Sequence, residues 1–128
     1  MHTPNTDRRR VLIVDDNPDA ATTLSLLLRT VGHQVEIAYD ASSGFSLASA
    51  HLPDVAIIDL VLPQESGTQL ARRMRALQGG EAVNLIALTG LNMHSSEVEA
   101  AGFNHYLLKP ASLEALKQAM ESRRPSLL

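Results

Sequence analysis

The stretch VAIIDLVLP, residues 55 to 63, decides the fold of this 128-residue chain. Four apolar residues run directly into the carboxylate of Asp59, and a loop with Pro63 and Gly67 follows. A short, continuously apolar run bounded by turn residues is typical of a strand buried on both faces of a sheet. Asp59 then lies at the carboxyl end of that strand, where open α/β sheets place their ligand sites. A lone aspartate there more often caps a turn, so the interpretation as a site depends on the rest of the chain.

Two further stretches favour a site. VLIVDD, residues 11 to 16, is a second apolar strand that ends in the acidic pair Asp15 and Asp16, and LLKP, residues 107 to 110, is an apolar run that ends in Lys109. If these strands are parallel neighbours, their ends bring three carboxylates and one ammonium together. Clustered carboxylates repel one another and bind protons or a hard cation. Oxygen ligands without Cys or His favour Mg²⁺, or Mn²⁺, over zinc or copper.

The rest of the chain alternates strands with helices. Strands are expected over residues 11–14, 34–38, 55–59, 83–89 and 105–108, and the five helices lie between and after them. Apolar residues at helical spacing give three of these helices a core face: Leu24, Leu27, Leu28 and Val31; Leu70, Met74 and Leu77; Leu113, Leu116 and Met120. In the third helix, Arg72, Arg73 and Arg75 are expected to point outward.

This alternation predicts an α/β fold with a parallel sheet and right-handed crossovers. For five strand–helix units, the doubly wound, flavodoxin-like strand order 2-1-3-4-5 is the natural choice, with its switch point between the first and third strands. That order places Asp15 and Asp16 beside Asp59. The expected organisation is a tail over residues 1–9, one domain over 10–124, and a tail over 125–128.

Composition narrows the class of protein. Hydrophobic residues make up 45% and charged residues 20% of the chain, which is the globular range. The chain contains no Cys, which fits a reducing compartment, and its net charge of -3 argues against direct nucleic-acid binding. No stretch approaches the roughly 20 apolar residues that span a bilayer, and the polar amino terminus lacks a signal-peptide core. We therefore expect a cytoplasmic protein without membrane insertion.

Four motifs in order resemble the receiver domain of two-component response regulators. They are Asp15-Asp16, Asp59 to Pro63 with Gly67, Ala87-Leu88-Thr89-Gly90, and Tyr106 to Pro110, and the resemblance covers about residues 10 to 123. It implies that Asp59 is the phosphoacceptor. It also implies Mg²⁺ (or Mn²⁺) held by Asp16 directly, by Asp15 through water, by Asp59 itself, and by the backbone carbonyl of Leu60.

The resemblance implies roles for four further residues. Lys109 would contact a phosphoryl oxygen, and the Lys109–Pro110 bond would be cis. Thr89 would bond another phosphoryl oxygen and move toward it, and Tyr106 would turn into the vacated space. This switch would remodel the surface of the fourth helix, fifth strand and fifth helix, where partners bind.

The resemblance also implies partners and a mode of action. The phosphoryl group would come from a phosphohistidine of a histidine kinase or histidine phosphotransfer protein, and an output partner, unknown from the sequence, would read the switch. The protein would not be a turnover enzyme. It would show only Mg²⁺-dependent self-phosphorylation and slow self-dephosphorylation, because Val61 and Leu91 are apolar where the family often carries polar, water-positioning side chains.

Several alternatives stay open at this point. The chain is either a free-standing regulator or a receiver from a longer protein such as a hybrid histidine kinase, whose receivers the stretches at 87–90 and 101–103 resemble. A phosphorylation-independent interaction module on the same fold is the second class of function. A flavodoxin-like cofactor binder is the third, but the acidic loop at 15–18 would repel a cofactor phosphate.

Overall fold

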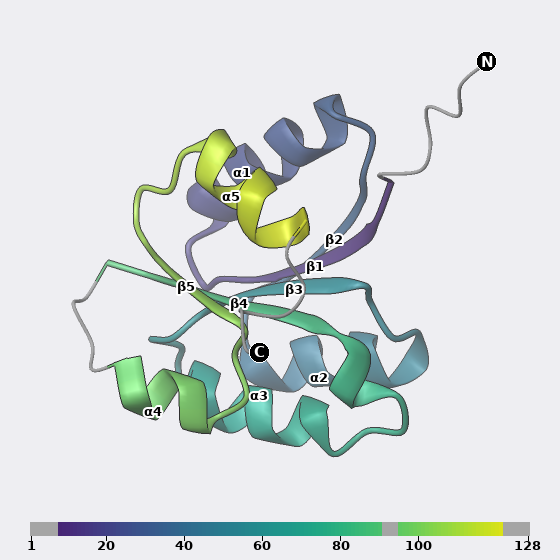
Figure 1. Cartoon of the computed structure of the whole chain (residues 1–128), viewed down its shortest axis with the longest axis vertical. Helices are drawn as coiled ribbons and strands as arrows, with labels where there is room; N and C mark the ends of the chain where they lie inside the picture. The colour runs from purple at the N-terminus through teal and green to yellow at the C-terminus, as the bar shows by residue number, and fades with distance from the viewer. Residues whose placement is uncertain (1–7, 91–94, 122–128) are drawn as a thin grey trace.

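The computed structural model describes residues 8–90 and 95–121, which form five strands and five α-helices in alternation (Figure 1). The strands are β1 (Arg10–Val14), β2 (Gln34–Ala38), β3 (Val55–Asp59), β4 (Asn84–Thr89) and β5 (His105–Leu108). The helices are α1 (Pro18–Thr30), α2 (Ala41–Ala50), α3 (Gly67–Arg75), α4 (Ser95–Ala100) and α5 (Leu113–Glu121), and a 3-10 turn, η2 (Gly80–Ala82), precedes β4.

The strands form one parallel sheet in the order β2-β1-β3-β4-β5, as the sequence predicts. β3 and β4 are central, and every one of their residues is buried. The register pairs Val14 with Ile58 and Thr89 with Leu108, so the carboxyl ends of β1, β3, β4 and β5 meet at one edge of the sheet. This edge is where the sequence places the site.

Helices cover both faces of the sheet, with α1 and α5 on one side and α2, α3 and α4 on the other (Figure 1). The pleat of each strand sends alternate side chains to opposite faces. Val11 and Ile13 therefore enter the core beneath α1 and α5, and Leu12 and Val14 enter the core beneath the other three helices. The result is a sheet buried between two aliphatic layers.

Side-chain caps set the helix bounds. The Asn17 side chain accepts from the amides of Asp19 and Ala20 at the start of α1, and Gly32, with a φ of +101°, lies just past its end. Asp40 accepts from Ser43 N–H at 2.8 Å at the start of α2. α3 begins with a reciprocal capping box between Ser66 and Gln69, and Ser112 caps α5.

The predicted core face of α1 is wrong in part. Leu28 is fully buried and Leu24 partly buried, but Leu27 and Val31 are 40% and 43% exposed. The buried stripe instead includes the small residues Ala21 and Ser25, because α1 packs closely against the sheet along that line. Leucines at helical spacing therefore do not all face the core here.

The prediction that Arg75 points outward is also wrong. Arg72 and Arg73 are exposed, but Arg75 is half-buried and donates hydrogen bonds to the carbonyl oxygens of Gly80, Val83 and Gly102. α3 ends at Arg75, so its side chain continues into the space between η2 and β5 where buried carbonyls need donors.

Within residues 8–90 and 95–121, no helix combines the length and the apolar character that a bilayer span requires. The expected tails over 1–9 and 125–128, the end of the domain at 124, and Leu91 lie wholly or partly outside the described residues.

Candidate functional site

Three strand ends build the acidic site. Because Val14 pairs with Ile58, Asp15 and Asp59 follow at the next register position on neighbouring strands. Asp15 and Asp59 are buried, with 4% and 8% of their surfaces exposed, whereas Asp16 is exposed. The topology thus brings together carboxylates that are 44 residues apart in sequence, as predicted.

Each buried carboxylate is oriented by its own loop. Oδ1 of Asp15 accepts from the Asn17 amide and Oδ1 of Asp59 accepts from the Val61 amide, both at 3.0 Å. These contacts, each from the amide two residues on, are those of an Asx turn, which aspartate forms readily. They leave the second oxygen, Oδ2, of each carboxylate to face the other strand ends.

Lys109 joins the two carboxylates. Its Nζ donates to Asp15 Oδ2 at 2.9 Å and to Asp59 Oδ2 at 3.0 Å. The backbone of Lys109 is fixed by a hydrogen bond from its amide to the Thr89 carbonyl at 2.8 Å, and the Lys109–Pro110 bond is cis, as the family resemblance implies. An ammonium held between two buried carboxylates offsets their mutual repulsion.

The ion pairs determine the protonation of Lys109. Burial of the ammonium acts to lower the pKa of Lys109, but hydrogen bonds and charges from Asp15 and Asp59 outweigh it, and the net pKa is raised above its ordinary value. Lys109 therefore stays charged across the neutral range. The site therefore keeps one positive group beside its buried carboxylates.

The loop after β3 packs tightly against the end of β3. A Cβ on Gly67 would lie 2.4 Å from the Asp59 carbonyl oxygen and 2.8 Å from Leu60 Cα, so only glycine fits there without a shift. The Gly67 amide donates to the Leu60 carbonyl at 3.0 Å. The Leu60 carbonyl thus has a protein partner already, and its predicted role as a metal ligand, which would use its second lone pair, stays a prediction.

The acid cluster fits a hard divalent cation. Ligand oxygens from Asp15, Asp16 and Asp59 all lie within 4.8 Å of one another. In an octahedron with Mg–O distances of about 2.1 Å, opposite ligands are about 4.2 Å and adjacent ligands about 3.0 Å apart, so direct ligands must approach one another, whereas a carboxylate that binds through water can lie farther out. The all-oxygen donor set is the one that Mg²⁺ and Mn²⁺ prefer.

The structure places the two predicted switch residues beside this edge. Thr89 is buried at the end of β4, one residue past the position that pairs with Asp59. Tyr106 on β5 pairs with Ala87 and packs, partly buried, against the core beneath α2, α3 and α4. Their roles in switching stay predictions. Val61 is 52% exposed beside Asp59, and Leu91 lies outside the described residues.

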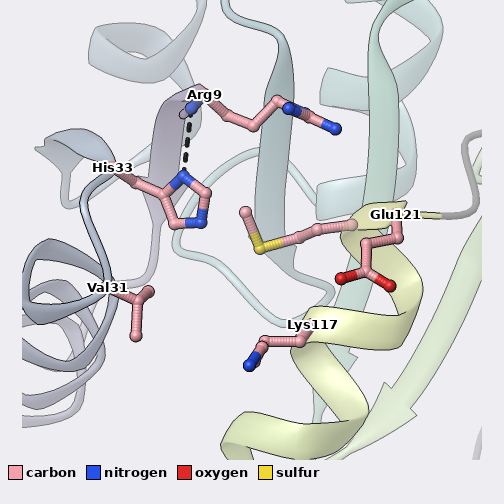
Figure 2. A pocket seen from close by; sticks show the side chains of 6 residues that line it. Arg9, Val31, His33, Lys117 and Glu121 are labelled. Atoms are coloured by element: carbon pink, nitrogen blue, oxygen red, sulfur yellow. Dashed lines mark hydrogen bonds between the residues drawn. The ribbon is translucent and has the colours of Figure 1, made fainter. Parts of the chain in front are cut away.

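One hollow adjoins the site and another lies far from it. A hollow of about 350 Å³ between α1 and the β5–α5 loop is lined by Asp15 and Lys109 and by apolar side chains, which include Leu24, Leu27 and Leu116. A smaller cavity of about 130 Å³ lies at the opposite edge of the sheet, lined by Arg9, His33 and Lys117 among others, where the Arg9 amide donates to His33 Nδ1 at 3.0 Å (Figure 2). Only the first adjoins the acid cluster.

The sequence matches the family model of the response regulator receiver domain over residues 11–121, so this chain belongs to that family. It is 36% identical over 115 residues to the virulence transcriptional regulatory protein PhoP of Shigella flexneri, and 35% identical to the transcriptional regulatory protein PhoP of Escherichia coli K12. Each match covers 88% of this chain and 51% of the relative. The chain thus spans about half the length of these curated relatives.

Comparison with solved structures indicates the same family. The receiver domain of a sensor histidine kinase from Pseudomonas aeruginosa, solved with magnesium in its active-site cleft, is 30% identical with a TM-score of 0.81, covering 88% of this chain and 94% of that one. A response regulator from Burkholderia pseudomallei with a phosphorylated aspartate and a calcium ion is 28% identical with a TM-score of 0.82, covering 89% and 67%. The flavodoxin-like architecture of a receiver domain is therefore established for this chain.

Sequence reasoning missed two contacts of the site. In the sequence, Gly67 is only a glycine in the loop that follows Pro63, and nothing there indicates how closely it approaches the β3 backbone. The contacts of Lys109 with both buried carboxylates follow from the register of the strands in three dimensions. A lysine at a strand end gives no sequence signal for which carboxylates it pairs with.

Proposed function

We propose that this receiver domain accepts a phosphoryl group on Asp59 from a phosphohistidine of a histidine kinase or a histidine phosphotransfer protein. The observation that carries the proposal is the Lys109 ammonium held between the carboxylates of Asp15 and Asp59 at the edge where β1, β3 and β4 end. An acceptor oxygen, carboxylates that can hold a cation, and a positively charged side chain are the groups that phosphoryl transfer requires.

The transfer is a substitution at phosphorus. A carboxylate oxygen of Asp59 forms the new P–O bond while the P–N bond to the donor imidazole breaks, and the imidazole leaves with the bonding electrons and takes up a proton. The amide of Val61 holds Oδ1 of Asp59 in place, and Lys109 shifts from Oδ2 toward the phosphoryl oxygens as charge arrives.

The cation is Mg²⁺ or Mn²⁺. Asp16 is the direct ligand, Asp15 binds through water, and Asp59 and the Leu60 carbonyl are the remaining protein ligands that we propose. When bound, the ion neutralises the phosphoryl oxygens during transfer. Support comes from the spacing of the three carboxylates and from their all-oxygen chemistry.

The output is a change of surface. Thr89 moves to bond a phosphoryl oxygen, Tyr106 turns inward, and the surface of α4, β5 and α5 is remodelled for a partner. The phosphoryl group shifts the population only by the contacts it makes better in the active state. Support comes from the position of Thr89 beside the acid cluster and of Tyr106 at the margin of the adjoining core.

The protein acts as a switch and not as a turnover enzyme. The covalent product stays on its own Asp59, and self-dephosphorylation is slow because the exposed Val61 side chain has no polar group to position water.

The phosphodonor approaches through the hollow beside Lys109, where Leu24 and Leu27 offer apolar contact next to the reacting groups.

The test is intact mass after incubation with Mg²⁺ and acetyl phosphate, with Asp59→Asn and a chelator as controls. One phosphoryl adduct, lost in both controls, is the expected result. If no adduct forms and a phosphorylated histidine phosphotransfer protein also fails to transfer, although Mg²⁺ binds, a phosphorylation-independent interaction module replaces the proposal. A yellow purified protein would instead indicate a flavin.

A further inference from the structure

The loop between β3 and α3 contains a strained turn. Gln64 has a φ of +72°, in the left-handed region that residues other than glycine avoid. The Glu65 amide donates to the Pro63 carbonyl at 2.7 Å across it. A φ near +75° within a three-residue hydrogen-bonded turn is typical of the rare and strained form of the γ-turn. The Gln64 side chain is exposed, so its packing does not hold the turn.

This turn lies inside the loop that orients the acid site. At one end of the loop, the Val61 amide donates to Asp59 Oδ1 at 3.0 Å. At the other end, the Gly67 amide donates to the Leu60 carbonyl at 3.0 Å. Gln64 lies between these two contacts along the chain, so a loop that leaves the turn also displaces the groups next to Asp59.

Three side chains connect the turn to the helices α2 and α3. Arg73 Nη1 donates to Glu65 Oε1 at 2.8 Å, and Arg73 Cζ lies 4.1 Å from the centroid of the Phe45 ring. Glu65 follows Gln64 directly, Arg73 belongs to α3, and Phe45 belongs to α2. We call these three side chains the Phe45–Arg73–Glu65 clamp.

The two contacts of Arg73 support each other. An exposed ion pair alone stabilises a protein little, because two long side chains lose conformational entropy in it. Phe45, however, is partly buried and packs against the core beneath α2 and α3. Its ring face orients the planar guanidinium, so less freedom remains for the ion pair with Glu65 to restrict. The clamp therefore attaches the residue after Gln64 to the core.

We propose that the Phe45–Arg73–Glu65 clamp holds the strained turn at Gln64, and thereby positions the loop groups that orient Asp59 and face the cation. This inference rests on the proposed phosphoacceptor function. Arg73 touches no reacting group, so it is a positioning residue that acts through Glu65 and the loop.

The experiment combines residue-resolved amide hydrogen exchange without ligand, the dissociation constant of Mg²⁺, and intact mass after incubation with acetyl phosphate. Arg73→Gln removes the charge, and Arg73→Lys keeps the charge but loses the planar group. Arg72→Gln is the matched control, because Arg72 is an exposed arginine of the same helix. Gln64→Gly, alone and together with Arg73→Gln, removes the strain, since glycine adopts a positive φ without steric cost.

The loop amides report on the clamp directly. In Arg73→Gln, the amides of Val61, Glu65 and Gly67 should exchange about fivefold faster than in the wild type, and the amides of α1 and α5 should be unchanged. The dissociation constant of Mg²⁺ should rise about threefold, because the apparent affinity falls with the fraction of molecules in the binding-competent conformation. Arg73→Lys should lie between Arg73→Gln and the wild type, and Arg72→Gln should equal the wild type.

The double variant tests whether the clamp acts on the strained turn. Once Gln64→Gly has removed the strain, adding Arg73→Gln should change neither loop exchange nor Mg²⁺ binding by more than about 1.5-fold, because both substitutions act on one turn. An equal effect of Arg73→Gln with and without Gln64→Gly would overturn the proposal. Wild-type loop exchange in Arg73→Gln would also overturn it, as would faster loop exchange with an unchanged dissociation constant of Mg²⁺.

Failure of the phosphoacceptor function gives a different result. The wild type would then form no phosphoryl adduct with acetyl phosphate or with a phosphorylated histidine phosphotransfer protein, as is expected of Asp59→Asn. Amide exchange and Mg²⁺ binding need no phosphoryl group, so the comparison of Arg73→Gln with the wild type would still decide whether the clamp holds the loop.

Discussion

Gly67→Ala tests whether the close packing of the β3–α3 loop positions Asp59, the proposed phosphoacceptor. The added Cβ would lie 2.4 Å from the Asp59 carbonyl oxygen, whereas real Cβ contacts essentially never fall below 3.0 Å. The start of α3 or the end of β3 must therefore move by about 0.6 Å, the difference between these distances. Both atoms that the Cβ meets most closely are backbone atoms, so no side chain can rotate away.

The expected loss of folding stability in Gly67→Ala follows from the same geometry. Where a glycine is not under strain, alanine stabilises a protein by about 0.4–1 kcal/mol through the unfolded state. Overpacking against backbone costs about 1–3 kcal/mol and reverses that gain. We expect Gly67→Ala to lower the free energy of unfolding by about 1–2 kcal/mol, which is a fall in melting temperature of roughly 4 °C per kcal/mol for a domain of this size.

The assay is chemical and thermal unfolding, with Gly90→Ala as the matched control. Among the described residues, no atom lies within 4 Å of a Cβ on Gly90, so this variant should be as stable as the wild type or slightly more stable. A shift at the end of β3 would displace Asp59, so phosphorylation of Gly67→Ala by acetyl phosphate should also slow by about tenfold or more. A Gly67→Ala protein as stable as Gly90→Ala, with wild-type phosphorylation, would refute the steric reasoning.

Three further predictions concern the acid cluster. Mg²⁺ at 100 times its dissociation constant should stabilise the wild type by about 2.7 kcal/mol through linkage, and Asp16→Asn should lose most of this gain in thermal unfolding. The folded-state pKa of Lys109 is raised above its ordinary value of 10.5, so the stabilisation that its ammonium gives is fully present below pH 10.5 and is lost as the pH rises through the higher folded-state pKa. The free energies of unfolding of the wild type and of Lys109→Met should therefore differ by a constant amount from pH 7 to 9 and converge above about pH 10.5. Val61→Asn should shorten the lifetime of the aspartyl phosphate, measured by loss of the mass adduct; an unchanged or longer lifetime would contradict the role given to Val61.

The sequence predicts the sheet and its acid cluster because both depend on local signals. An apolar run that ends in Asp59 or in Asp15 marks a buried strand and its carboxyl end at once, and the alternation of strands and helices then determines the topology. Caps such as Asn17 and Asp40 predict the helix starts for the same reason, since their hydrogen bonds go to amides two or three residues on.

Contacts between distant segments are not predictable in this way. Arg75 lies on the same helix as the exposed Arg72, three residues on, and only the carbonyls of Gly80, Val83 and Gly102 around it decide that it turns inward. On α1, helical spacing alone selects Leu27, but the close packing of Ala21 against the sheet rotates that leucine to the surface. In both places the partner that decides the outcome lies outside the helix.

The charges at the site explain why the cation and the phosphoryl group should favour each other. Three carboxylates and the Lys109 ammonium leave a formal charge of -2, concentrated where Asp15 and Asp59 are buried. Such a site repels a phosphoryl donor, which is itself an anion, and a divalent cation brings the formal charge to zero. Phosphoryl transfer removes the single negative charge of the Asp59 carboxylate and adds the two negative charges of an acyl phosphate. The product therefore carries more negative charge near the cation than the starting carboxylate did. The product should therefore bind the cation more tightly than the unmodified protein, and by reciprocity the cation should stabilise the phosphorylated state.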